Sequence, residues 1–219
     1  MKALVSRGRR TTMKIVLKSS QQLWFSSDSH YSHKNICRGV SEWEPGRGQR
    51  DFDTVEEMND MMVKNINGCA KEDDILIHIG DWSFGGISQV SEFRDRLVCN
   101  DIILVLGNHD HHIRHCKAGL QPLFSRVTSY MELWVNKQMF VFSHFPLAVW
   151  DMIAHGSIML HGHTHKRPEK RFGKGKMLDC GLDGNVEFRP YSILEITELL
   201  QERPIGCYLE DDYHVREGL

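Results

Sequence analysis

In Ile102-Ile103-Leu104-Val105-Leu106-Gly107-Asn108-His109-Asp110, an apolar run leads directly into a polar cluster. The run is too short for a helix and is rich in β-branched residues, which favours a buried strand. Gly107 allows a tight turn at the end of that strand. Because α/β proteins bind ligands at the carboxyl ends of their strands, this stretch predicts both a buried strand and a site beside it.

Two earlier stretches show the same arrangement. Leu23-Trp24-Phe25 precedes Asp28 and His30, and Asp74–Ile79 precedes Gly80-Asp81. Helices are predicted between the strands. Thr54-Val55-Glu56-Glu57 is typical of a capping box, after which Val55, Met58, Met62 and Ile66 repeat at helical spacing as a core stripe. Residues 88–98 follow the same period, with Val90, Phe93, Leu97 and Val98 facing inward. This alternation of strand, loop and helix indicates a layered α/β domain.

The second half of the chain is richer in predicted strands. Runs at 131–135 and 139–142 flank Asn136-Lys137, which favours a hairpin ending near His144. The apolar run Ser157–His161 leads into Gly162-His163-Thr164-His165. If the strand continued through these residues, side-chain alternation would aim both rings the same way. Met177–Leu182 and Tyr191–Ile196 are predicted as further strands.

The bulk properties fit one globular domain. We expect residues 13–219 to form it and residues 1–12, which are basic without a following apolar segment, to be a disordered extension rather than a signal peptide. With a formal net charge of -2, the chain lacks the overall positive charge that is typical of proteins binding duplex nucleic acid or an anionic membrane. The six cysteines are scattered without a Cys-x-x-Cys pair, which favours free thiols and a cytoplasmic location.

The strand ends together supply a donor set suited to metal ions. They offer two carboxylates, one amide oxygen and four imidazoles: Asp28, Asp81, Asn108, His30, His144, His163 and His165. Neutral imidazoles and carboxylates suit divalent transition metals. One bridging carboxylate would let these seven residues make eight contacts to two metals roughly 3.5–4 Å apart. We therefore expect a centre holding two divalent ions.

The order of the motifs resembles the calcineurin-like metallophosphoesterase superfamily, whose members carry D-x-H, G-D, G-N-H-D/E, H and G-H-x-H. All five are present in order over residues 28–165, and the chain looks closest to small prokaryotic and phage-type members. The resemblance implies a four-layer α/β/β/α sandwich, the metallo-dependent phosphatase fold. It also implies a phosphoric ester hydrolase.

The resemblance assigns roles at the matching positions. One metal would be held by Asp28, His30, Asp81 and His165, and the other by Asp81, Asn108, His144 and His163. Phosphoester hydrolysis would follow by in-line attack of a metal-bridging hydroxide. His109 would act as general acid, with Asp110 accepting its other N–H. Phe84 occupies the position of the iron-binding tyrosine of purple acid phosphatases, so Mn²⁺, Ni²⁺, Zn²⁺ or Fe²⁺ are expected instead.

The substrate is less constrained. Phosphomonoesters and small or cyclic phosphodiesters, including nucleotides, are the first expectation, with His33, Arg38 and Arg50 as substrate-binding candidates because guanidinium suits phosphate. The basic segment 166–176 keeps open a nuclease acting on single-stranded nucleic acid. A non-catalytic scaffold of the same fold is a third alternative, although scaffolds tend to lose their ligands and all seven are intact here.

Overall fold

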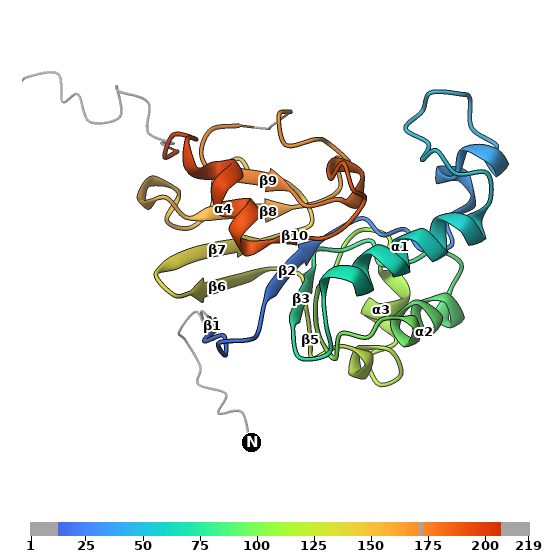
Figure 1. The fold of residues 1–219 in the computed structure, drawn as a ribbon, viewed down its shortest axis with the longest axis horizontal. Helices are drawn as coiled ribbons and strands as arrows, with labels where there is room; N and C mark the ends of the chain where they lie inside the picture. The colour runs from blue at the N-terminus through green and yellow to red at the C-terminus, as the bar shows by residue number, and fades with distance from the viewer. Residues whose placement is uncertain (1–12, 171–172, 207–219) are drawn as a thin grey trace, which may run out of the picture.

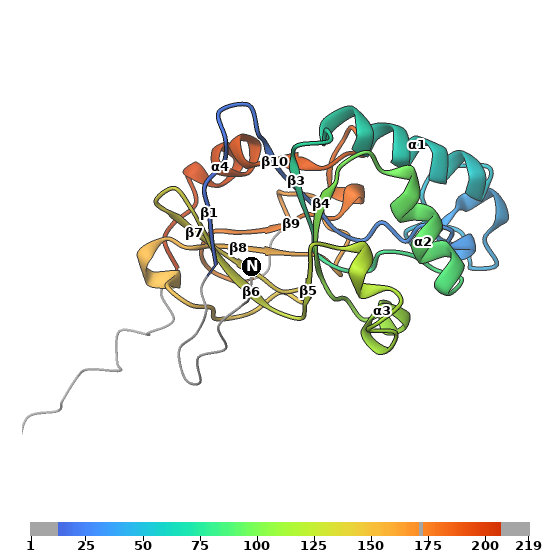
Figure 2. The same cartoon turned by 90° about the horizontal axis from the view of Figure 1, so that it is seen from below.

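The computed structural model describes residues 13–170 and 173–206. Two five-stranded sheets lie face to face, and helices cover the outer face of one of them (Figures 1 and 2). The predicted extension at residues 1–12 lies outside the described residues, and the single-domain organisation over 13–219 stays a prediction.

The first sheet has the order β10-β2-β3-β4-β5. Its strands are β2 (Leu23–Ser26), β3 (Ile75–His78), β4 (Asp101–Val105), β5 (Arg126–Thr128) and β10 (Tyr191–Ser192). The pairs from β2 to β5 are all parallel, whereas β10 runs antiparallel to β2. The carboxyl ends of β2, β3 and β4 therefore lie at one edge, where the polar clusters follow.

The second sheet has the order β1-β6-β7-β8-β9. Its strands are β1 (Met13–Ile15), β6 (Met131–Val135), β7 (Gln138–Phe142), β8 (Ile158–His161) and β9 (Met177–Asp179). The predicted hairpin is confirmed as antiparallel β6 and β7, while β7, β8 and β9 pair in parallel. His144 and the Gly162–His165 loop consequently leave this sheet at the same edge.

Apolar residues from both sheets form the central core. Phe25, Phe140 and Phe142 stack there with ring centroids 5.8–6.3 Å apart. A second core lies between the first sheet and its helices, α1 (Val55–Cys69), α2 (Ile87–Arg96) and α3 (His111–His115). The predicted Met-rich stripe of α1 is buried at Met58, Met62 and Ile66. Val98, predicted to face inward, is 42% exposed because α2 ends before it.

The outer face of the second sheet is covered by the segment 145–157. Trp150 and Ile153 from this segment pack on Met139, Val141 and Met159 of the sheet. Five short 3₁₀ turns connect the described elements: η1 (Lys34–Ile36), η2 (Arg38–Val40), η3 (Gln121–Leu123), η4 (Ile153–His155) and η5 (Leu182–Gly184). The α/β sandwich expected from the sequence is thus present.

The prediction of a strand over Tyr191–Ile196 is wrong beyond its first two residues. Helix α4 (Ile193–Gln201) begins there, and Ser192 and Glu195 close a reciprocal capping box. Satisfying two backbone N–H groups at the helix start favours the helix over a longer edge strand. At the start of α1, by contrast, Glu57 accepts from the N–H of Asp53 rather than from that of Thr54. None of the described helices is long and apolar enough to cross a bilayer.

Candidate metal centre

Asp28, His30 and His165 form the first cluster of potential ligands. The Nε2 atom of His30 lies 3.2 Å from Nε2 of His165 and 3.6 Å from Oδ1 of Asp28. Oδ1 of Asp28 is also 3.5 Å from Nε2 of His165. Residues 135 positions apart in the chain are thus brought into one group, because β2 and β8 end at the same edge of the sandwich.

Asp81, His144 and His163 form the second cluster. Oδ2 of Asp81 lies 3.3 Å from Nε2 of His144, and Oδ1 of Asn108 lies 3.0 Å from the same nitrogen. Within the parts of the chain that the structure describes, these two clusters are the groups of three or more His, Cys, Asp or Glu that could hold a metal. The seven ligands expected from the sequence therefore lie in or beside these clusters.

Asp81 stands between the two clusters. Its Oδ2 lies 3.3 Å from His144 in one cluster and 3.7 Å from Nε2 of His30 in the other. Its Oδ1 accepts the backbone N–H of His109 at 2.8 Å, which fixes the carboxylate plane. A carboxylate in this position can contact two cations at once.

Hydrogen bonds on the far side of two imidazoles fix where their free lone pairs point. Nδ1 of His144 donates to the carbonyl oxygen of Ile79 at 2.8 Å, and Nδ1 of His165 lies 2.6 Å from Oδ2 of Asp183. In the neutral ring, Nε2 of each histidine then carries a lone pair aimed into its cluster. Such outer partners are typical of metal-binding histidines.

Charge at the two clusters is distributed in the way a cation site requires. Burial alone would raise the pKa of Asp28, but neighbouring His30, His165 and His144 hold it well below its usual range. Burial likewise opposes protonation of His144, yet the hydrogen bond with Asp81 and the charges of Asp28 and Asp81 raise the pKa of His144 to about 9. The nitrogen and oxygen acceptor atoms of these residues converge on one point, and His144 keeps a proton there at neutral pH. Both features fit a site for a divalent ion.

The ligands sit on strained backbone beyond the strand ends. Asp28, His30, Asp81, His163 and His165 all have positive φ, between 48° and 70°. Left-handed backbone is uncommon for residues other than glycine and clusters at functional sites. The possibility that His163 and His165 alternate along a strand is wrong, because β8 ends at His161. Their rings instead enter different clusters.

Two glycines make room for the aspartate ligands. A Cβ atom at Gly162 would overlap with Ser27 and with Oδ2 of Asp28, and one at Gly107 would overlap with Asp81. Any side chain at either position would therefore push a ligand carboxylate out of place. This close packing explains why glycine begins both the Gly-Asn-His-Asp motif at Gly107 and the Gly-His-Thr-His motif at Gly162.

His109 and Asp110 are placed differently from each other. The His109 side chain is 43% exposed, and its Nε2 lies 4.0 Å from Oδ2 of Asp81, at the open side of the centre. The Asp110 carboxylate is buried and accepts the backbone N–H groups of Asp81, Trp82 and Gly107. It therefore ties the ends of β3 and β4 together, and the expected contact with the His109 ring is absent among the described residues.

The two arginines predicted to bind substrate are engaged within the protein. Arg50 is buried and donates to Asp183, to the carbonyl oxygens of Asp28 and Ser29, and weakly to the Met58 sulfur. Arg38 lies on the surface in ion pairs with Asp51 and Asp53. Neither guanidinium points into the cavity beside the clusters. We attribute a positioning role to Arg50, since it holds the Asp183 carboxylate that contacts His165.

His33 is the substrate-binding candidate that lines a cavity. This cavity, of about 670 Å³, opens beside the first cluster and is also lined by His30, Phe84, His109 and His165. Nδ1 of His33 accepts the N–H of Ile36 at 2.9 Å. Burial and the nearby His30 and His109 lower the pKa of His33 to about 4, so the ring is neutral at pH 7.

Asp179 and Asp183 contact the loop of His163 and His165 from outside the two clusters, and each has a specific place. Asp183 contacts His165 directly. Asp179 accepts the Thr164 hydroxyl at 2.5 Å and the Lys166 N–H at 3.2 Å, which holds the loop between His163 and His165. Both acidic residues follow or end β9, and that position at the same sheet edge is the signal that could have found them.

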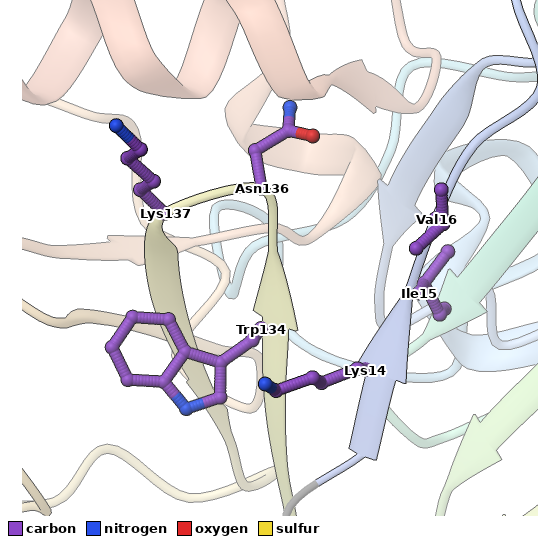
Figure 3. Close-up of a pocket in the computed structure, with 6 residues that line it drawn as sticks. All are labelled: Lys14, Ile15, Val16, Trp134, Asn136 and Lys137. Carbon is purple, nitrogen blue, oxygen red and sulfur yellow. The ribbon is translucent and has the colours of Figure 1, made fainter.

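A second cavity, of about 540 Å³, shares none of its lining residues with the two clusters (Figure 3). It is lined by β1 and the β6–β7 turn, and the side chain of Lys14 extends toward the Trp134 ring. Because β6 and β7 are antiparallel, this turn stands at the opposite end of β7 from His144. Its lining has no carboxylate or imidazole, so it has no part in the metal centre.

The sequence profile of the calcineurin-like phosphoesterase family matches residues 22–198. That span contains both ligand clusters. The chain belongs to the calcineurin-like phosphoesterase family. The family uses divalent metal ions, and the donor set described above fits them.

Relatives from an archaeon and a phage resemble almost the whole chain. An uncharacterized protein of Methanocaldococcus jannaschii, MJ1445, is 26% identical over 88% of this chain and 99% of its own length. The gene 66 protein of Mycobacterium phage D29 is 26% identical over 82% of this chain and 96% of its own. A solved protein of unknown function from Aquifex aeolicus, AQ665, shares the fold with a TM-score of 0.60 and 21% identity, covering 82% of this chain and all of that one.

Proposed function

We propose that this calcineurin-like phosphoesterase hydrolyses phosphomonoesters or small phosphodiesters, cyclic ones included, at a centre of two divalent metal ions. The observation that carries the proposal is the position of Asp81, whose Oδ2 lies 3.3 Å from His144 in one cluster and 3.7 Å from His30 in the other. Asp28, His30, Asp81 and His165 would hold one ion. Asp81, Asn108, His144 and His163 would hold the other.

Two bound divalent ions supply an activated water and neutralise charge on the phosphoryl oxygens. The protein supplies a rigid frame for them. Asp110 fixes the backbone around Asp81, and Arg50 with Asp183 fixes the His165 ring. Because Asp110 and Arg50 are buried and Asp183 is held by both Arg50 and His165, the ligands need little rearrangement when the ions bind.

His109 is the proposed general acid. Its ring is exposed on the cavity side, 4.0 Å from Asp81, and its backbone N–H is fixed by the Asp81 carboxylate. From this position the imidazole can give a proton to the departing alkoxide. A positioned imidazole typically contributes about 10²–10⁴-fold to such a step.

The test is an activity screen of protein stripped with chelator and reconstituted separately with Mn²⁺, Ni²⁺, Zn²⁺ or Fe²⁺. Alkyl monoesters, diesters and cyclic phosphodiesters are assayed with the wild type and with Asp81→Ala. Metal-dependent turnover of at least one class that disappears in Asp81→Ala is expected. Turnover that persists in the variant, or no turnover with any ion, would overturn the proposal.

A further inference from the structure

The cavity beside the metal centre has one wall that comes from outside the metal-binding motifs. The loop 41–49 contributes Trp43, Arg47 and Gly48 to its lining. Among the described lining residues Arg47 is the lone permanent cation, and no carboxylate is present. A cavity of about 670 Å³ that is free of acidic groups has the size and charge to accept a phosphoester larger than the phosphate itself.

Aromatic rings connect this wall to the proposed general acid. The Trp43 ring lies 5.5 Å from that of His33, and His33 meets Phe84 edge to face at 3.7 Å. Phe84 in turn lies 4.6 Å from the His109 ring. A group attached to a phosphate at the metal centre would therefore extend along a row of aromatic side chains.

Trp43 is exposed to solvent on a loop that is held in place by hydrogen bonds. The residue is 41% exposed although its ring is large and apolar. Its backbone N–H is held by the Ser41 hydroxyl, the preceding N–H donates to Asn35, and Gln49 donates back to the carbonyl oxygen of Glu44. An exposed indole on an anchored loop can stack with a planar ligand at low entropic cost.

Arg47 differs from the other two arginines of its region. Arg38 is paired with Asp51 and Asp53, and Arg50 is buried against Asp183. Arg47 makes no hydrogen bond or ion pair with the residues that the structure describes, and it lines the cavity. Its guanidinium is therefore the one in this region that can bind a phosphate oxygen of a substrate.

We propose that Trp43 and Arg47 form a recognition wall for a nucleotide, with Trp43 stacking on the nucleobase and Arg47 contacting phosphate. The inference rests on the proposed hydrolysis at the metal centre and names the class of substrate for it. Every base offers a flat face, so stacking on one indole favours nucleotides in general rather than one base. Hydrolysis of a free nucleotide and of a nucleotide at the end of a single strand would share this chemistry.

The experiment compares substrates that differ only in the base. A nucleoside 5′-monophosphate is paired with ribose 5-phosphate, and a cyclic nucleotide with the corresponding abasic cyclic phosphate. The variants are Trp43→Ala, Trp43→Phe, Arg47→Ala and, as a matched control from the same region, Arg38→Ala. A short single-stranded oligonucleotide is the last substrate, because its hydrolysis distinguishes activity at strand ends from activity on free nucleotides.

Trp43→Ala should lower kcat/KM for the base-bearing substrates about tenfold, the scale of one lost base–aromatic stack. It should leave the abasic partners unchanged, and Trp43→Phe should keep most of the wild-type value. Arg47→Ala should raise KM for both members of each pair, whereas Arg38→Ala should change neither. Equal effects of Trp43→Ala on both members of a pair, or none on either, would overturn the inference.

A binding measurement separates this inference from the proposed function. Calorimetric titration of the metal-loaded wild type with the nucleoside monophosphate and with ribose 5-phosphate should show about tenfold tighter binding of the nucleotide, lost in Trp43→Ala. That preference would stand even if no ester were hydrolysed. Absence of the preference, with hydrolysis of both substrates intact, would remove the recognition wall and leave the phosphoesterase proposal in place.

Discussion

Nδ1 of His165 lies 2.6 Å from Oδ2 of Asp183, and Arg50 holds the same carboxylate from its other side. The opposite nitrogen of His165 faces Asp28 and His30. Arg50 keeps the pKa of the Asp183 carboxyl well below its usual range, against the effect of burial, so the carboxylate is charged. The chain from Arg50 through Asp183 to His165 therefore orients a candidate metal ligand from outside the centre.

Asp183→Asn should weaken metal binding at the cluster of Asp28, His30 and His165. The amide retains the shape but loses the charge that orients the His165 ring, and loss of such a partner typically costs 10–100-fold in metal affinity. Competition with a fluorescent chelator measures the affinity. Asp51→Asn, which alters an exposed partner of Arg38, is the control and should match the wild type. Equal affinities for all three proteins would contradict the positioning role.

Gly162→Ala should remove the ion at the cluster of Asp28, His30 and His165 while most of the fold survives. The added methyl group overlaps with Ser27 and Asp28, so the Asp28 carboxylate must move. Gly68→Ala makes the same change in helix α1, where nothing lies within 4 Å, and should stabilise the protein by about 0.5–1 kcal/mol. Metal content by elemental analysis and thermal unfolding separate the two effects. A fully metal-loaded Gly162→Ala protein would refute the crowding argument.

His109→Ala should retain both metals and lose rate in a way that depends on the leaving group. Alkyl esters need a proton on the departing oxygen, so kcat should fall about 10²–10⁴-fold for them. Nitrophenyl esters leave without that proton and should be affected much less. His111→Ala, in the same segment, serves as the control. A loss of equal size for both kinds of ester would exclude the general-acid role.

The metal-free protein should lose stability as the pH rises. The pKa of His144 is about 9 in the folded chain against an ordinary 6.5, because Asp81 and Asp28 outweigh the opposing effect of burial. The folded state thus keeps a proton that the unfolded state gives up. This contribution, about 3 kcal/mol at most, is complete below about pH 6.5 and is lost as the pH rises through about 9.

Thermal unfolding in chelator between about pH 6 and pH 9 measures that loss. His144→Gln lacks the titrating ring, so its unfolding midpoint should depend less on pH. The unfolding midpoint of the metal-loaded protein should not show the pH dependence of the chelated protein. A pH-independent unfolding midpoint for the chelated wild type would disprove the assigned protonation.

The positions of the candidate ligands could be predicted from the sequence because each follows an apolar run too short for a helix. Asp28, Asp81 and Asn108 lie just beyond the carboxyl ends of parallel strands of one sheet, and those ends share an edge. The pattern could not predict the backbone conformation of the residues beyond the strand ends. His163 and His165 adopt left-handed conformations that alternation along a strand does not describe.

Other parts of the site depend on contacts between distant segments. Arg50 and Asp183 are 133 positions apart, and nothing in either local sequence distinguishes Arg50 from Arg38 or Arg47. Asp110 accepts three backbone N–H groups instead of the expected ring N–H of His109, and only the folded structure brings those donors to it. Helix α4, by contrast, was predictable, because Ser192-Ile193-Leu194-Glu195 has the spacing of a capping box.

The central claim is that two metal ions share Asp81, and metal stoichiometry tests it most directly. Elemental analysis of wild type saturated with Mn²⁺ and then desalted should give about two ions per chain, in line with a two-metal site. His163→Ala and His165→Ala should each retain about one, and Asp81→Asn should retain almost none. A single ion in the wild type, or two in Asp81→Asn, would contradict the account.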